Sequence, residues 1–225
     1  MTGALTYEAT TRFLETEKIH YHEAGHGPAL ILIHGSGPGV TGWANFQGNI
    51  GVFAEKFRTF IVDLPGSGGS APVEGNPMAG AAQAIVRFMD AMKIDKAHIL
   101  GNSLGGIVGS LVAAQHPARV NRFVAIGGLG YSIFNTFPGE GITLLSEFAE
   151  NPTRENIVRW LHSMVFDQSM ITDALIETRM KQALEPNTLA ATRALYSKAA
   201  INGLKAMNNG PNAAASFAHL AAIQA

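Results

Sequence analysis

Residues 97–106 read Ala-His-Ile-Leu-Gly-Asn-Ser-Leu-Gly-Gly, and this stretch decides the fold. Its first four residues form a short apolar run of the kind that a buried strand shows. From Leu104 an apolar segment continues to Gln115, just before Pro117, as expected for a helix. Glycines at 101 and 105 permit close backbone approach in the turn between them. The stretch therefore predicts a strand, a tight turn at Ser103 and a helix.

Units of the same kind lie on both sides of this stretch. A helix is predicted over 78–92, because Ile85, Phe88, Met89 and Met92 repeat at the spacing of one helical face. The segment 43–57 is long enough for a helical crossover. Further apolar runs predict strands at 29–33, 57–62 and 120–126, the last of which we count as the sixth. This alternation predicts an α/β fold with a mostly parallel, doubly wound sheet.

After residue 130 the pattern changes to three or four successive helical stretches without a strand. Asn151-Pro152 reads as the N-cap and first residue of one helix, and Thr172-Asp173 opens another. We expect a core at 1–130, a helical lid inserted after the sixth strand at 131–207, and a segment at 208–225 that returns toward the core. Trp160, Met164 and Phe166 are expected to line the underside of a lid helix, where they either roof a pocket or pack on the core.

Composition narrows the class of protein. The chain has 225 residues, 47% hydrophobic and 15% charged, enough for one domain with a sizeable core. Its 16 basic and 17 acidic residues form no basic cluster that would neutralise a row of phosphates, so we expect no nucleic-acid partner. No signal peptide is visible and no apolar run approaches a membrane span, so we expect a cytoplasmic protein without a membrane partner.

Ser103 is the candidate nucleophile. Residues 101–105 spell G-x-S-x-G between a strand and a helix, which is the setting of a nucleophile elbow. The glycine-rich loop at 34–39 follows the strand at 29–33, where a second donor for an oxyanion would lie. We expect the backbone N–H of Ser36 or Gly37 to meet that of Leu104 at one oxygen atom. The alternative interpretation is that residues 101–105 form a tight turn with a purely structural role.

Two other motifs could indicate a nucleotide-binding site. Residues 37–42 form a literal G-x-G-x-x-G, and Asp63 ends the next strand, as a ribose-binding acid does in a dinucleotide fold. Pro38 removes a donor that a pyrophosphate would need, which disfavours this interpretation. The run at 66–70 lacks the lysine of a P-loop and reads as a plain turn.

Histidines offer little evidence for a metal. His20 and His22 share one face of a strand, but no further ligand cluster accompanies them, so we interpret them as surface histidines of a strand. The chain has no cysteine, which excludes disulfides, thiolate metal sites and a cysteine nucleophile. We expect no metal and no cofactor.

A triad built on Ser103 needs an acid and then a histidine later in the chain. His116 ends the elbow helix, His162 lies in the lid and His219 precedes the place of a seventh strand. Asp167 and Asp173 are lid residues. None of these suits a triad position.

Several segments resemble the meta-cleavage-product hydrolases, which hydrolyse carbon–carbon bonds and have the α/β-hydrolase fold. The similar segments are 34–46 (His-Gly-Ser-Gly-Pro-Gly-Val-Thr-Gly-Trp-Ala-Asn-Phe), 101–106, Gly-Gly-Leu-Gly at 127–130, and 166–169 through Arg179. The first and last are the specific ones, because simple esterases share only the elbow.

The resemblance implies roles for individual residues. Ser103 would be the nucleophile, Ser36 and Leu104 the oxyanion donors, and Asn45, Asn102 and Arg179 the polar contacts of a dienoate substrate. A guanidinium suits the substrate's carboxylate, and amides suit its enol oxygen. The family cleaves 2-hydroxy-6-oxo-hexa-2,4-dienoates from aromatic-ring degradation, and its members usually form homo-oligomers.

The resemblance also implies two further strands that bear the triad aspartate and histidine. We expect these residues to lie beyond Ala225, and the printed sequence to be part of a longer one. Two alternatives remain open: a carboxylesterase or lactonase on the same fold, and a catalytically inactive binding protein of this fold if the chain is complete.

Overall fold

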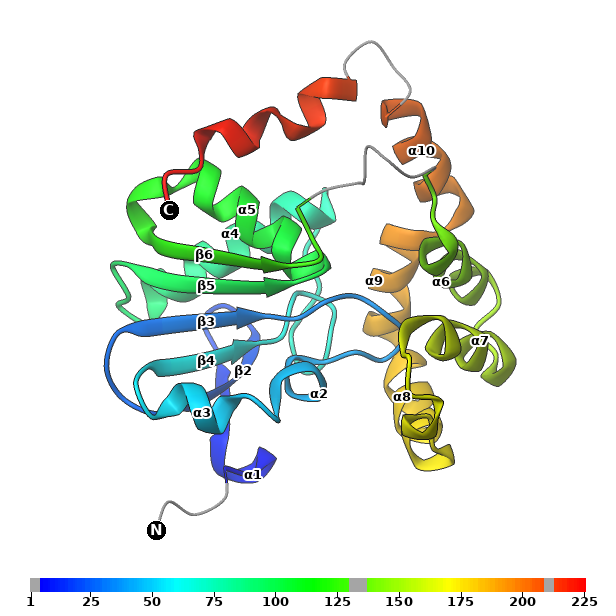
Figure 1. Ribbon diagram of the computed structural model, residues 1–225, viewed down its shortest axis with the longest axis horizontal. Coiled ribbons are helices and arrows are strands. Elements are labelled where there is room, and N and C mark those ends of the chain that lie inside the picture. The colour runs from blue at the N-terminus through cyan, green and yellow to red at the C-terminus, as the bar shows by residue number, and fades with distance from the viewer. Residues whose placement is uncertain (1–4, 130–136, 209–212) are drawn as a thin grey trace. The chain divides into compact units, whose positions relative to one another are not determined.

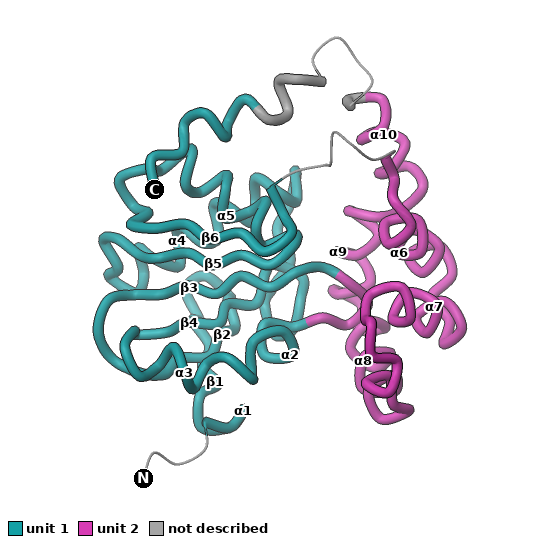
Figure 2. Tube along the Cα trace, in the orientation of Figure 1, with its two compact units in different colours: residues 1–36, 41–130, 217–225 teal, residues 37–40, 131–216 magenta. Residues whose placement is uncertain are grey.

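A computed structural model describes residues 5–129, 137–208 and 213–225, without the side chains of 207–208 and 213–217. The chain divides into two compact units (Figure 2). Unit 1 comprises residues 1–36, 41–130 and 217–225, and unit 2 comprises residues 37–40 and 131–216.

Unit 1 is built on a six-stranded sheet of order β1-β2-β4-β3-β5-β6 (Figure 1). The four strands β4, β3, β5 and β6 are parallel, while β1 and β2 pair in antiparallel fashion at one side. The mostly parallel sheet is therefore confirmed. The strands are β1 (Thr11–Leu14), β2 (Ile19–Ala24), β3 (Ala29–Ile33), β4 (Arg58–Val62), β5 (Ala97–Asn102) and β6 (Val120–Ile126).

Helices cover both faces of this sheet. On one face α4 (Pro77–Ala91) packs beside α5 (Leu104–Gln115), and the rings of Phe88 and Phe60 meet edge to face with centroids 5.5 Å apart. On the other face, α2 (Gly42–Phe46) and α3 (Ile50–Ala54) bury Phe46 and Ile50 against β3 and β4. The crossover expected at 43–57 is thus two short helices. Shorter pieces are α1 (Tyr7–Thr10), η1 (Pro117–Arg119) and η3 (Ala213–Ala222).

The apolar stripe of α4 is confirmed. Ile85, Phe88 and Met89 are fully buried. The helix begins at Pro77, where Asn76 accepts hydrogen bonds from the N–H groups of Met78 and Ala79. The stripe therefore fixes which face of α4 lies on the sheet.

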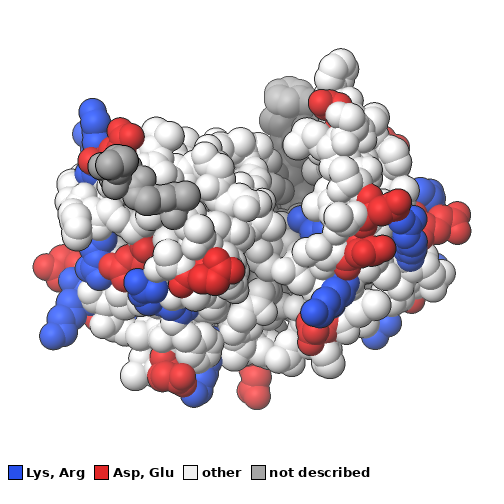
Figure 3. Space-filling view, turned by 90° about the horizontal axis from the view of Figure 1, so that it is seen from below, with Lys and Arg blue, Asp and Glu red and all other residues white. Residues whose placement is uncertain are grey.

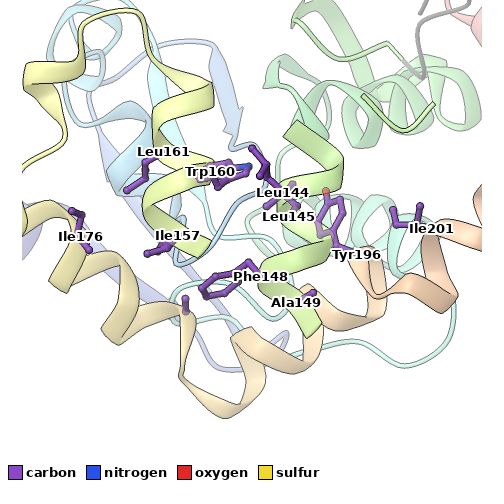
Figure 4. Packing of buried hydrophobic residues seen from close by; sticks show 11 residues of the cluster. Leu144, Leu145, Phe148, Ala149, Ile157, Trp160, Leu161, Ile176, Tyr196 and Ile201 are labelled. Atoms are coloured by element: carbon purple, nitrogen blue, oxygen red, sulfur yellow. The ribbon is translucent and has the colours of Figure 1, made fainter. Parts of the chain in front are cut away.

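The regular secondary structure in the described part of unit 2 is entirely helical. It contains α6 (Glu140–Glu150), α7 (Arg154–Met164), η2 (Gln168–Met170), α8 (Asp173–Ala183), α9 (Pro186–Tyr196) and α10 (Lys198–Asn208). Leu144, Leu145 and Phe148 of α6 face Ile157, Trp160 and Leu161 of α7, and Ile176, Tyr196 and Ile201 extend the cluster to the other helices (Figure 4). Unit 2 thus has a hydrophobic core of its own.

Two predicted helix starts in unit 2 have different outcomes. Thr172 caps α8 by accepting from the N–H of Leu175, as predicted. The start predicted at Asn151-Pro152 is wrong, because Thr153 is the N-cap of α7 and accepts from the N–H of Asn156. A threonine hydroxyl at the right distance from the third N–H outcompetes the asparagine–proline signal.

The interpretation of His20 and His22 as surface residues is wrong. Both point from β2 into unit 1, where His22 is completely buried, and their rings meet with centroids 5.0 Å apart. His20 Nδ1 lies 2.7 Å from Oδ2 of Asp63, and its Nε2 lies 2.7 Å from the Thr11 hydroxyl. No group of three candidate metal ligands occurs among the described residues. The histidines belong to a buried polar network.

His22 is the member of this network that lies mainly among aromatic rings. Thr10 donates its hydroxyl proton to the carbonyl of Thr6, so the same oxygen accepts from His22 Nδ1, 3.0 Å away. In the described part of the chain, Nε2 of His22 has no hydrogen-bond partner. The rings of Tyr7 and Trp43 enclose it. Burial and the neighbouring His20 lower the pKa of His22 to about 4.

On the face shown in Figure 3, basic and acidic side chains are intermixed. Exposed ion pairs of the described residues include Lys18–Glu15 and Arg159–Glu147. None of the helices that the structure describes has the length and apolar character needed to span a bilayer.

The buried His22 predicts a specific pH dependence of stability. Between its folded pKa of about 4 and the ordinary value of 6.5, the folded chain binds fewer protons than the unfolded chain. The free energy of unfolding should therefore decrease as the pH falls through this range. His22→Asn, which keeps a donor for Thr10 but cannot be protonated, should flatten the profile in chemical denaturation. His26→Asn, at an exposed position, is the control. Equal slopes for wild type and His22→Asn would contradict this assignment.

Candidate active site

The turn after β5 holds Ser103 in a strained conformation. Ser103 has φ 51° and ψ −115°, in the region that non-glycine residues rarely adopt. Its N–H donates to the carbonyl of Ile126 at 2.7 Å, which fixes the turn to β6. The residue is exposed, and Leu104 follows as the first residue of α5. The geometry is that of a nucleophile elbow, with a helix N-terminus directly behind the hydroxyl.

Glycines permit the backbone crossings around the elbow. A Cβ on Gly101 would lie 2.2 Å from the carbonyl oxygen of Gly105, and one on Gly105 would lie 2.1 Å from that of Ile33. A Cβ on Gly128, after β6, would lie 1.8 Å from the carbonyl oxygen of Ser103. The close backbone approach predicted at Gly101 and Gly105 is therefore confirmed.

The loop after β3 lies against the elbow. A Cβ on Gly35 would be 3.2 Å from Cβ of Ser103. The N–H of Gly35 donates to Oδ1 of Asn45 at 3.0 Å, and Nδ2 of Asn102 donates to the same oxygen at 3.0 Å. Asn45 thus joins the loop that contains Ser36 to the residue before Ser103. The structure brings these sequence-predicted residues together within unit 1.

The two asparagines use opposite ends of their amides. In these bonds Asn45 uses only its carbonyl oxygen, and Asn102 only its amide nitrogen. The partners therefore assign both amide orientations. Nδ2 of Asn45 keeps its donor capacity and Oδ1 of Asn102 keeps its acceptor capacity toward a third group.

In unit 2, residues 37–40 pack against α7 and α8. A Cβ on Gly37 would lie 2.3 Å from the Trp160 ring, and one on Gly39 would lie 2.1 Å from the carbonyl oxygen of Arg179. Nε of Arg179 donates to the carbonyl of Pro38 at 2.7 Å. The Pro-Gly-Val loop and Arg179 of α8, which are distant in sequence, therefore form one structural element.

Arg179 is a candidate anion-binding residue. Its guanidinium carbon lies 5.6 Å from the centre of the Trp160 ring, and burial lowers the pKa of Arg179 to about 10, so it stays charged at neutral pH. No carboxylate of the described residues forms an ion pair with it. The cation is held in place, and the described residues offer it no counter-charge.

The aromatic residues expected beneath a lid helix lie in different environments. Trp160 is 5% exposed in the core of unit 2 (Figure 4). Met164 is about half exposed at the end of α7, and Phe166 lies beyond it and is fully exposed. The expectation that Phe166 lies on the underside of that helix is wrong, because α7 ends at Met164. The same expectation for Met164 stays a prediction. A substrate contact of Phe166 stays a prediction.

None of the described histidines of unit 1 is bonded to Ser103. His34 is bonded through both ring nitrogens, to the carbonyl of Gly35 and the N–H of Leu64. His219 bonds the hydroxyl of Ser110, seven residues along α5, and His116 follows the end of that helix. At about 1.5 Å rise per residue, these contacts lie roughly 10 Å and 20 Å from the start of α5. These geometries offer Ser103 no general base.

Asp63 is unsuited to bind a ribose. Its carboxylate is 2% exposed, with Oδ1 accepting from the N–H of Gly42 and Oδ2 from the N–H of Gly69 as well as from His20. Burial alone would raise the pKa of Asp63, but hydrogen bonds from His20 and Gly42, together with charge interactions with His34 and His20, hold it below the ordinary value. Asp63 is therefore not available as the ribose-binding acid that the dinucleotide interpretation requires.

Comparison with known proteins decides the family. A family model described as the alpha/beta hydrolase fold matches residues 28–205. The chain belongs to the α/β-hydrolase fold family.

Relatives within this family also match the resemblance noted from the sequence. A 2-hydroxy-6-oxo-6-phenylhexa-2,4-dienoate hydrolase of Burkholderia cepacia is 42% identical over 74% of the chain and 60% of its own length. A 2-hydroxy-6-oxononadienedioate/2-hydroxy-6-oxononatrienedioate hydrolase of Burkholderia vietnamiensis is 39% identical over 80% of the chain and 66% of its own length. The resemblance to meta-cleavage-product hydrolases is thereby confirmed, and the chain spans about 60 to 66% of the length of these relatives.

Solved structures of α/β-hydrolases have a similar fold. The meta-cleavage product hydrolase CumD of Pseudomonas fluorescens IP01 superposes with a TM-score of 0.74 at 29% identity, covering 83% of this chain and 67% of its own. The 2-hydroxy-6-oxo-6-phenylhexa-2,4-dienoate hydrolase BphD of Rhodococcus sp. strain RHA1 gives 0.71 at 26% identity, covering 83% and 70%.

Sequence reasoning missed the supporting role that two polar residues have at the α/β-hydrolase elbow. His34 and Asp63 each follow a buried strand directly, β3 and β4. Polar residues at the carboxyl ends of parallel strands meet at one edge of the sheet. That shared position was the available signal.

The elbow predicts a strong effect of a single methyl group. Gly105→Ala should destabilise the chain by about 3 kcal/mol or more, because its Cβ meets the backbone of β3, which cannot move aside. Gly51→Ala, on α3 with open space around it, is the matched control and should be neutral or slightly stabilising. Denaturant unfolding of both variants measures the difference. Similar effects of the two substitutions would show that the crossing at Gly105 is not tight.

Proposed function

We propose that this chain is the nucleophile-bearing part of a hydrolase that cleaves a carbon–carbon bond in 2-hydroxy-6-oxo-hexa-2,4-dienoate ring-fission products. The observation that carries the proposal is Arg179, a charged side chain held by Pro38 and Trp160 without a carboxylate partner among the described residues. Neutral esters would not need such a cation. The relatives named as dienoate hydrolases support the same substrate class.

The proposal assigns separate roles in this reaction to Arg179, Asn45 and Asn102. In unit 2, the Arg179 guanidinium would pair with the substrate's carboxylate by charge-assisted hydrogen bonds. In unit 1, Nδ2 of Asn45 would donate to the enol or keto oxygen at C2, and Oδ1 of Asn102 would accept its proton. This assignment follows from the amide ends that the two asparagines leave for a third group.

Ser103 would attack the distant keto carbonyl after the dienol has ketonised. The Ser103 oxygen forms a bond to that carbon, and the developing oxyanion accepts from the N–H groups of Ser36 and Leu104. Breaking the carbon–carbon bond then leaves an acyl group on Ser103 and a dienoate that takes up a proton, and water releases the acid. The hydroxyl needs a base to accept its proton, and we keep the expectation that an acid and a histidine beyond Ala225 supply it.

The cellular setting of the enzyme belongs to the same proposal. A small-molecule substrate agrees with the relatives' names. We place the enzyme in the cytoplasm as a homo-oligomer. Cell fractionation would test the location, and gel filtration would test the assembly.

Arg179→Gln should separate acidic from neutral ligands. Loss of a charge-assisted hydrogen bond costs about 1.5 to 3 kcal/mol, so binding of 2-hydroxy-6-oxo-6-phenylhexa-2,4-dienoate should weaken roughly 10- to 150-fold. Binding of a p-nitrophenyl ester, which has no carboxylate, should change little. Calorimetric titration of the chain with both ligands measures this.

The matched control is Arg159→Gln, on α7, whose side chain pairs with Glu147 at the surface. It should leave both affinities unchanged. Equal losses of dienoate and ester binding in Arg179→Gln would show that Arg179 is only structural, and would remove the main support for a dienoate substrate.

A further inference from the structure

The ring of His34 is fixed at both nitrogens. It is 1% exposed at the end of β3. The N–H of Leu64 donates to Nε2 at 2.9 Å, and Nδ1 lies 2.6 Å from the carbonyl oxygen of Gly35. A backbone N–H can only donate and a carbonyl can only accept, so the proton is on Nδ1 and Nε2 carries a lone pair. The two bonds are satisfied together only by this neutral tautomer.

The bond from His34 also orients the next N–H group. The carbonyl of Gly35 and the N–H of Ser36 belong to one planar trans peptide, in which they point in opposite directions. A donor that holds the carbonyl on one side therefore directs the N–H of Ser36 to the other side. The hydrogen bond on the oxygen also polarises the peptide and strengthens its N–H as a donor.

A second contact fixes Gly35 through its N–H group. The N–H of Gly35 donates to Oδ1 of Asn45, whose helix α2 begins at Gly42. The N–H of Gly42 is itself held by Asp63 at 2.6 Å. Leu64, which anchors His34, is the residue after Asp63. Both supports of Gly35 therefore start from the same corner at the end of β4.

We propose that His34 is a positioning residue that directs the N–H of Ser36, with the Nδ1 proton on the Gly35 carbonyl and Leu64 as its anchor. The inference rests on the proposed function in so far as Ser36 is an oxyanion donor. It assigns His34 a task that requires a neutral ring and excludes it as the base for Ser103. It also explains why a histidine, with one donor and one acceptor atom on a rigid ring, suits this position.

Two substitutions separate the two bonds of His34. His34→Asn keeps a donor near the place of Nδ1 and loses the acceptor for Leu64. His34→Gln keeps an acceptor near the place of Nε2 and loses the donor for Gly35. NMR of the isotope-labelled 225-residue chain reports each bond. The amide nitrogen shift of Ser36 responds to the hydrogen bond on the Gly35 carbonyl, and hydrogen exchange of the Leu64 amide responds to its own acceptor.

We expect the wild-type ring spectrum to show His34 protonated at Nδ1 alone. In His34→Gln the Ser36 nitrogen signal should shift upfield while Leu64 stays protected. In His34→Asn the Ser36 signal should stay near its wild-type position, while the Leu64 amide exchanges roughly tenfold faster.

A proton on Nε2 in the wild type would overturn the proposal, and this measurement needs no variant to fold. Equal shifts of Ser36 in both variants would also overturn it, because they would mean that His34 only fills space. These spectra are recorded without substrate, so a failure of the dienoate proposal would leave their result intact.

Discussion

The carboxylate of Asp63 holds together the corner on which the candidate active site is built. It is buried at the end of β4, where it accepts hydrogen bonds from the backbone of Gly42 and Gly69 and from the ring of His20. A buried charge is tolerated only when it is fully hydrogen-bonded, so these groups cannot move independently of it. Through Gly42 the carboxylate fixes the start of α2. The position of Asn45, and with it the contact between the glycine loop and the elbow, depends on that helix.

The elbow itself combines strain with close packing. Ser103 adopts a positive φ that its neighbours enforce, since its N–H is bonded to β6 and Gly105 lies against the backbone of β3. Such strain persists only where the surrounding structure determines the conformation. The hydrophobic residues of β3, β4 and α4 supply that rigidity. The exposed hydroxyl is thus held at the edge of a rigid sheet, next to the first N–H groups of α5.

Much of this architecture could be predicted from the sequence, because periodicity reports burial directly. The strands at 29–33 and 120–126 and the helix at 104–115 match the predicted bounds, since each is an apolar run ended by turn residues. His20 and His22 could not be predicted as buried, because a polar residue in a strand is buried only when partners such as Asp63 and Thr10 are near in space. The pairing of Arg179 with Pro38 links positions 141 residues apart, and no local pattern encodes it.

The central claim is that these 225 residues carry a nucleophile and its oxyanion donors, while the base for Ser103 comes from outside them. The most direct measurement compares the decay of 2-hydroxy-6-oxo-6-phenylhexa-2,4-dienoate by three proteins: the 225-residue chain, the chain extended by the C-terminal part of the Burkholderia cepacia relative, and the extended chain with Ser103→Ala. The extended chain should turn over the dienoate, and Ser103→Ala should abolish this. The 225-residue chain should keep only the acceleration of about 10³ to 10⁴ over water that binding and an oxyanion hole provide. Equal rates for the 225-residue and extended chains would contradict the claim, because His34, His116, His162 or His219 would then have to serve as the base.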